Sequence, residues 1–318
     1  MRLVFMGTPL FATIIFEAIF SKHTILAVFT QCDKPVGRKG IITPPPMKVQ
    51  ALQKGVQVFQ PSVLDSSVQK QIALLKPEAI IVVAYGKILP KEILDIAPCI
   101  NVHASILPKY RGASPIQQMI LNDEKQYGVS IMRMEEGLDN GGILAIKTIP
   151  RNQQDYPALS QTLAHLGAQG LCEVLQNLSA ITPILQDESK ASYCAKIQKS
   201  NGLIDFANAK DIYLKSLAFN PWPGIFLPNG IKIFGVKVVE NTKDFALDGV
   251  DFNNKHKDNV VYKAGEILSL YPVIVACKNG AIQIEQMQAP SKNKIDASIF
   301  LKSRAIKTGD NLLELPLV

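Results

Sequence analysis

A series of short apolar runs in the first part of the sequence constrains its fold more than any other feature. The runs occupy residues 3–6, 25–30, 56–59, 79–84, 100–103 and 129–134. Segments long enough to form helices separate them, which is typical of a parallel sheet covered by helices on both faces. The pattern therefore predicts an α/β domain with a Rossmann-like, mostly parallel sheet. A length of 318 residues leaves room for a second domain.

The glycine pattern argues against a nicotinamide-dependent oxidoreductase, which is one alternative for such a sheet. Gly7 follows the first run, but no G-x-G-x-x-G fingerprint surrounds it. The five cysteines are scattered without a C-x-x-C pair, and four histidines form no H-E-x-x-H motif. We therefore expect reduced thiols and no metal site.

Composition and the N-terminal residues predict a cytoplasmic protein. The positive net charge permits an anionic partner such as nucleic acid but does not require one. The net charge is +7, from 34 Lys and Arg against 27 Asp and Glu. No apolar run approaches the roughly 20 residues of a membrane span. The first residues read directly as a strand, without a targeting leader. We expect no association with a membrane.

The sequence changes character after a predicted helix at residues 157–178. Residues 181–204 contain Pro183 and few apolar side chains, and we interpret them as a linker. Asn-Gly pairs at 229–230 and 279–280 stand beside apolar strand patterns, which is a strong hairpin signal. The predicted organisation is an α/β domain at 1–180, the linker at 181–204 and a small β domain at 205–318.

Residues 101–115, Asn-Val-His-Ala-Ser-Ile-Leu-Pro-Lys-Tyr-Arg-Gly-Ala-Ser-Pro, carry the densest chemistry in the sequence. Asn101 and His103 are two apart, so on a strand both side chains point to one face. Pro108 ends the strand at its carboxyl end, where open parallel sheets bind ligands. An amide that polarises a carbonyl, beside a base, suits acyl-type transfer. The alternative is a structural histidine whose hydrogen bonds are satisfied within the strand and which has no role in catalysis.

An acidic, glycine-rich turn at residues 135–142 follows the last apolar run and places Asp139 at the end of a predicted strand. A carboxylate there can approach His103, fix its tautomer and raise its basicity. The alternative is an ordinary turn aspartate that bonds its own backbone.

The Asn-x-His strand, the Ser-Ile-Leu-Pro loop and the Leu-Asp-x-Gly turn together resemble the formyltransferases that use 10-formyltetrahydrofolate. Within that group the chain is similar to the members that act on methionyl-tRNA, from residues 5–9 to the C-terminal domain. Two departures are visible. Ile106 stands where leucine is usual, a volume-conserving change. Residues 140–142 read Asn-Gly-Gly where the family usually has Thr-Gly-Asp.

The resemblance implies a role for three sets of residues. The catalytic set is Asn101, His103 and Asp139. The set expected to bind 10-formyltetrahydrofolate comprises two loops, with Ser105, Ile106, Leu107 and Pro108 in one, and Tyr85, Gly86, Ile88 and Leu89 in the other. The third set lies in the long connection 31–46, where the family's insertion enters the acceptor arm of the tRNA, and comprises Lys34, Arg38 and Lys39.

The length of that connection supports a functional loop independently, because most such connections take only about 2–6 residues. Basic side chains on it suit a phosphate backbone. The alternative is a solvated surface loop.

The resemblance also implies an activity. It is transfer of a formyl group from 10-formyltetrahydrofolate to the amino group of methionyl initiator tRNA, giving N-formylmethionyl-tRNA for translation initiation. It implies an OB-like barrel at 205–318 that binds tRNA, and we expect a monomer. A formyltransferase for a sugar amine or purine precursor is the nearest alternative, and it would survive truncation near Pro183. A non-catalytic RNA-binding protein is another, and it would tolerate loss of Asn101 or Asp139.

Overall fold

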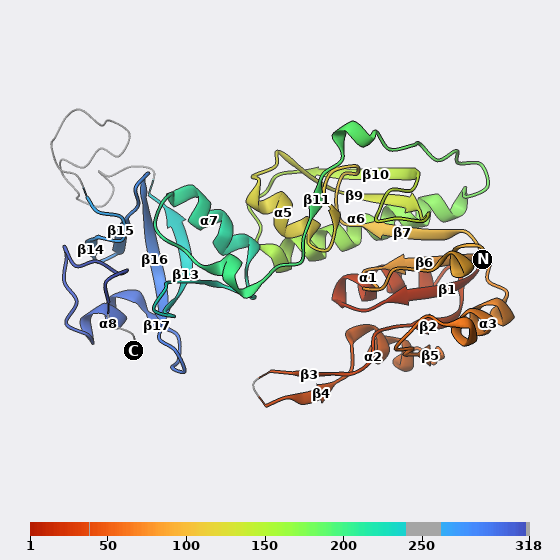
Figure 1. The fold of residues 1–318 in the computed structure, drawn as a ribbon, viewed down its shortest axis with the longest axis horizontal. Coiled ribbons are helices and arrows are strands. Elements are labelled where there is room, and N and C mark those ends of the chain that lie inside the picture. The colour runs from red at the N-terminus through yellow and green to blue at the C-terminus, as the bar shows by residue number, and fades with distance from the viewer. Residues whose placement is uncertain (38, 240–261, 316–318) are drawn as a thin grey trace. The chain divides into compact units, whose positions relative to one another are not determined.

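The computed structural model describes residues 1–37, 39–239 and 262–315, and their fold is drawn in Figure 1. The chain divides into two compact units. Unit 1 comprises residues 1–119, 124–152 and 158–196, and unit 2 comprises 120–123, 153–157 and 197–318. The domain ranges expected from the sequence stay a prediction. Within the described ranges, no helix is both long and apolar enough to span a membrane.

Unit 1 contains a seven-stranded sheet in the order β10-β9-β7-β6-β1-β2-β5. Its strands are β1 (Arg2–Gly7), β2 (Thr24–Phe29), β5 (Val58–Phe59), β6 (Ala79–Val83), β7 (Cys99–His103), β9 (Gln126–Arg133) and β10 (Ile143–Pro150). The strands from β7 to β5 pair in parallel. Strands β9 and β10 add an antiparallel edge beside β7. The predicted mostly parallel sheet is confirmed.

Helices surround this sheet. They are α1 (Leu10–Phe20), α2 (Pro46–Gln53), α3 (Ser66–Leu75), α4 (Lys91–Leu94), α5 (Pro115–Leu121) and α6 (Tyr156–Gln176). Two glycines of α6 allow a close approach to the sheet. A Cβ at Gly167 would lie 2.7 Å from Val102 Cγ1, and one at Gly170 would lie 2.7 Å from Ile131 Cδ1. Real Cβ atoms do not pack so closely, so glycine at these positions lets α6 lie in direct contact with β7 and β9.

Two small strand pairs complete unit 1. The connection at 31–46, predicted as a loop, forms a hairpin of β3 (Lys34–Val36) and β4 (Ile41–Thr43). The second pair joins β8 (Arg111–Gly112) in parallel to β11 (Tyr193–Cys194). A short helical turn, η1 (Glu188–Lys190), precedes β11. The segment around 186–194 therefore packs on the strand that follows the candidate active-site loop.

Unit 2 has an antiparallel sheet in the order β12-β13-β16-β15-β14, with β17 paired to β16. Its elements are β12 (Ile225–Phe226), β13 (Lys232–Val238), β14 (Ile267–Leu270), β15 (Val273–Ala276), β16 (Ala281–Gln288), β17 (Ile295–Asp296), η2 (Lys199–Gly202), α7 (Ala209–Ala218) and α8 (Ala297–Lys302). Both Asn-Gly turns join paired strands, β12 to β13 and β15 to β16, as predicted. The described strands do not close into a barrel, so the OB-like barrel stays a prediction.

Candidate active site

Strand β7 presents Asn101 and His103 at its carboxyl end, as their spacing predicted. Asn101 is 8% exposed and His103 is 6% exposed, and the alternating Ile100 and Val102 are buried as well. The strand lies between β6 and β9, where it cannot shift without breaking both ladders. Two polar side chains are thus held rigidly at the end of this strand.

The Asp139 carboxylate meets both of these side chains. Asn101 Nδ2 donates to Asp139 Oδ1 over 3.4 Å, and His103 Nδ1 lies 3.6 Å from Asp139 Oδ2. The backbone N–H of Gly112 donates to Oδ2 at 2.8 Å. The structure therefore brings together the three residues predicted to be catalytic.

The hydrogen-bond partner of His103 defines its tautomer. Its Nε2 lies 2.9 Å from the carbonyl oxygen of Tyr110, which only accepts, so Nε2 carries a hydrogen. In the neutral ring, Nδ1 then carries a lone pair, which faces the carboxylate of Asp139. Two acceptors 3.6 Å apart can share a donor that lies beside them, within hydrogen-bond distance of both. An amine is such a group.

Gly112 fits a position that other residues do not tolerate. Its φ is +114°, and a Cβ would lie 2.5 Å from the carbonyl oxygen of Cys194 in the paired strand β11. A side chain here pushes β8 away from β11 and withdraws the N–H from Asp139. The sequence contains this glycine in its 101–115 stretch but gives no signal of its contact with Asp139.

We expect Gly112→Ala to lower kcat by roughly tenfold or more, because a small displacement at an active site is costly. The backbone strain should also destabilise the protein by about 1–3 kcal/mol. Steady-state rates and thermal unfolding measure both effects. Gly55→Ala is the matched control, since Gly55 also has a positive φ of 71° but no atom within 4 Å of its added Cβ. Equal behaviour of the two variants would contradict the proposed steric role.

The loop at residues 105–108 is fixed by its own hydrogen bonds. Ser105 is fully buried and donates from Oγ to the Lys109 carbonyl at 2.6 Å. Ser130 Oγ on β9 accepts from the Leu107 N–H at 3.0 Å and donates to the Ser105 carbonyl at 2.8 Å. Sequence reasoning missed Ser130, although a lone hydroxyl within an apolar run was a usable signal. The Ser105 and Ser130 hydroxyls thus define the shape of this loop.

Ile106, Leu107 and Pro108 differ in their surroundings. Leu107 packs with Met132 and Ile143, and its bond to the partly exposed Pro108 is cis. Ile106 lines a hollow of about 510 Å³ beside the loop. None of the three catalytic candidates lines that hollow.

The loop after β6 has a buried and an exposed side. Tyr85 is 1% exposed and Leu89 is 4% exposed, while Gly86 is exposed and Ile88 is 80% exposed. Burial raises the pKa of Tyr85 to about 12. The Tyr85 hydroxyl is a buried polar atom with no hydrogen-bond partner among the described residues. The four predicted lining residues therefore do not share one environment.

Two of the predicted tRNA-contacting residues are described by the structure, Lys34 in β3 and Lys39 in the turn before β4. Lys34 and Lys39 are exposed, whereas Arg38 lies outside the described residues. The hairpin also exposes apolar side chains, with Val36 56% and Ile41 62% exposed. In the described part of the chain, no group of three or more His, Cys, Asp and Glu side chains is arranged to hold a metal.

An amide, an imidazole and a carboxylate thus meet at the carboxyl end of β7 in a mostly parallel sheet, and sequence comparison identifies the class of the chain. Residues 1–175 match the formyl transferase family, and residues 196–305 match the formyl transferase C-terminal domain. The chain belongs to the formyltransferase family.

Two relatives that match nearly the whole chain are named for one activity within this family. The methionyl-tRNA formyltransferase of Nitratiruptor sp. is 46% identical over 316 residues, covering 98% of this chain and 99% of the relative. That of Helicobacter pylori is 46% identical over 316 residues, covering 97% and 99%. The similarity therefore spans both units.

Solved structures with lower identity share the fold. HypX from Aquifex aeolicus, in complex with tetrahydrofolic acid, has a TM-score of 0.62 and 17% identity, covering 100% of this chain and 50% of that one. An N-formyltransferase from Helicobacter canadensis, in complex with folinic acid and dTDP-3-aminofucose, has a TM-score of 0.63 and 18% identity, covering 92% and 99%.

Proposed function

We propose that this chain transfers the formyl group of 10-formyltetrahydrofolate to the free amino group of methionyl initiator tRNA in the cytoplasm. The product is N-formylmethionyl-tRNA, used in translation initiation. The observation that carries the proposal is the convergence of Asn101 and His103 on the carboxylate of Asp139. The names of the full-length relatives support the choice of amine.

Asn101 is suited to stabilise the charge that develops during transfer. Attack of an amine on the formyl carbon puts negative charge on the formyl oxygen. The Asn101 amide has two hydrogens, and its single bond to Asp139 leaves the other for that oxygen. Asp139 also fixes the rotation of the amide, so the donor is oriented before the substrate arrives.

His103 and Asp139 are suited to receive the proton that the amine releases. The Nδ1 lone pair and Oδ2 face one position from two sides. Their side chains are 7% and 15% exposed, so little water competes for that position. The Gly112 N–H keeps the carboxylate directed at it. A base placed within reach contributes about 10²–10⁴-fold in known cases.

The loops at 85–89 and 105–108 would hold the formyl donor, which supplies the activated formyl carbon. Ile88 offers a large exposed apolar side chain for a flat pterin ring. The unpaired Tyr85 hydroxyl is a polar group still in need of a partner. The residues present therefore fit the donor.

The tRNA is proposed to contact the β3–β4 hairpin through Lys34, Arg38 and Lys39 and to contact the C-terminal domain at 205–318, for which we propose an OB-like barrel. Lysines exposed on a hairpin suit phosphate contacts. We propose that the protein acts as a monomer.

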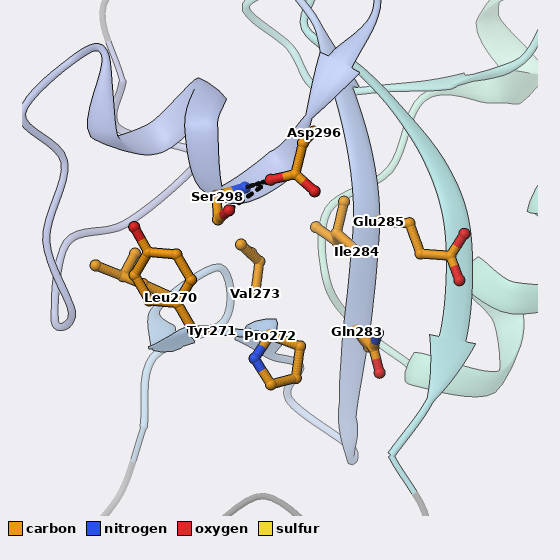
Figure 2. A pocket seen from close by; sticks show the side chains of 9 residues that line it. All are labelled: Leu270, Tyr271, Pro272, Val273, Gln283, Ile284, Glu285, Asp296 and Ser298. Carbon is orange, nitrogen blue, oxygen red and sulfur yellow. Dashed lines mark hydrogen bonds between the residues drawn. The ribbon is translucent and has the colours of Figure 1, made fainter.

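One part of unit 2 is unsuited to phosphates. An open hollow of about 340 Å³ lies between the β14–β15 turn, β16 and the start of α8. Figure 2 shows the side chains that line it. Glu285 and Asp296 both line it. Both carboxylates are already paired, Glu285 with Lys237 and Asp296 with N–H groups at the start of α8, but no Lys or Arg among the described residues lines the hollow. We therefore place the tRNA contacts of unit 2 away from it.

A single-turnover assay tests the proposal. The full chain is mixed with 10-formyltetrahydrofolate carrying a labelled formyl group and with methionyl initiator tRNA, and the label on the tRNA is measured. We expect rapid transfer to the methionyl amine. Transfer to a nucleotide-linked amino sugar, with none to tRNA, would keep the chemistry and overturn the acceptor. Binding of tRNA without transfer to either would overturn the enzymatic proposal.

A further inference from the structure

We propose that Gln186 is a positioning residue, which holds Asp139 in place for transfer through a ring of hydrogen bonds that includes Arg111. The inference rests on the proposed function, since it assigns Asp139 a part in that reaction. Gln186 lies in the segment that the sequence analysis interpreted as a linker and gave no role.

The Gln186 side-chain amide binds two backbone carbonyl groups of the turn that carries Asp139. Its Nε2 donates to the carbonyl oxygens of Asp139 and Gly141, each at 2.8 Å. Asp139 has a φ of +50°, which is uncommon outside glycine and asparagine. Such a conformation persists when surrounding contacts fix it, and these two hydrogen bonds are contacts of that kind.

Arg111 fixes the orientation of the Gln186 amide. Its Nε and Nη2 donate to Gln186 Oε1 at 3.1 and 2.8 Å. The guanidinium group can only donate, so the amide oxygen of Gln186 must face Arg111 and its amide nitrogen must face the turn. Arg111 is 1% exposed and also donates to both carboxylate oxygens of Glu188, at 2.9 and 2.6 Å. A buried guanidinium with these partners is a rigid anchor.

The ring closes through the residues on either side of Arg111. The Tyr110 carbonyl accepts the hydrogen of His103 Nε2, and the Gly112 N–H binds the Asp139 carboxylate. One short segment thus fixes the imidazole and the carboxylate, and through Gln186 it also fixes the backbone beneath that carboxylate. None of the hydrogen bonds found for Gln186 involves Asn101 or His103, so its role is exerted through Asp139.

Loss of the Gln186 amide frees the turn while leaving the substrate contacts in place. The carboxylate then departs from the position between Asn101 and His103. A misplacement of about 1 Å costs up to roughly 10²-fold in rate. The effect should fall on kcat, because neither the β3–β4 hairpin nor the donor loops contact Gln186 through its hydrogen bonds.

The test uses the full chain with Gln186→Leu, which keeps the approximate length but removes the donors. We expect kcat to fall roughly 10- to 100-fold, with KM for methionyl-tRNA changed by less than about threefold. Gln169→Leu is the matched control, since Gln169 is exposed on α6 and bonds only to Glu173 in the structure. A wild-type kcat in Gln186→Leu, or a loss confined to KM, would overturn the inference.

A double variant separates positioning from a general structural defect. If Gln186 acts through Asp139, Gln186→Leu with Asp139→Asn should be no slower than Asp139→Asn alone, within about threefold. Multiplication of the two losses would overturn the inference. Gln186→Glu serves if the leucine variant does not fold, because it keeps the pairing with Arg111 and removes the donors. It should show the same loss in kcat.

The wild-type control keeps the two proposals distinguishable. Wild-type turnover on methionyl-tRNA tests the proposed function. The ratio of each variant to wild type, taken on whichever amine the wild type formylates, tests Gln186.

Discussion

Asn101→Ala should lower kcat by ~10²–10³-fold, the usual cost of removing one oxyanion donor. Asn101 is held in the central part of the sheet and oriented by Asp139, so alanine leaves the fold and the other two side chains in place. The charge on the formyl oxygen then lacks this donor. Single-turnover formylation of methionyl initiator tRNA measures the loss, and filter binding measures tRNA affinity separately.

Asn177→Ala is the control for Asn101→Ala. Asn177 is exposed just beyond α6, and its side-chain amide donates to the Glu173 carbonyl at 3.4 Å. It should retain the wild-type rate. If Asn101→Ala keeps its rate within about threefold, well short of the loss expected for an oxyanion donor, then Asn101 has no such role.

Asp139→Asn should lower the rate by ~10²–10⁴-fold, as loss of a general base does. The asparagine oxygen can still accept from the Gly112 N–H, so the turn survives. Its amide nitrogen, however, would then replace Oδ1 and face the Nδ2 donor of Asn101, and no carboxylate would remain to receive the proton of the amine. The loss should appear in kcat and persist across the pH range in which wild type is active.

Asp95→Asn is the matched control for Asp139→Asn, because Asp95 pairs with Lys91 on the surface of unit 1. It should be indistinguishable from wild type. An Asp139→Asn rate within about threefold of wild type would contradict a role for Asp139 in proton transfer.

The features of this chain that were predictable from sequence are those encoded locally. Apolar runs flanked by helical segments predicted the sheet, and Asn101, two residues before His103, predicted a shared face. The two Asn-Gly turns predicted their hairpins because the turn type itself requires those residues. Asp139 needed the family resemblance, since an aspartate in a turn is common.

The features that were not predictable depend on contacts between distant residues. Gln186 meets Asp139 across a sequence separation of 47 residues, within a polar segment that has no periodic pattern. Strands β8 and β11 have two residues each, too few for alternation to be visible. The β3–β4 hairpin was not predicted, because its strands have three residues each and contain or border Pro35, Gly37 and Gly40, which are typical of turns.

The pairing of β8 with β11 has a consequence for the biogenesis of the protein. A nascent chain that has reached residue 180 already contains Asn101, His103 and Asp139 but lacks Gln186, Glu188 and β11. The buried guanidinium of Arg111 then has neither of those acceptors. The proposed catalytic centre is therefore completed only after residues 186–194 have been synthesised and have packed beside β8. A truncated enzyme intended to keep its chemistry should end after Lys196 rather than near Pro183.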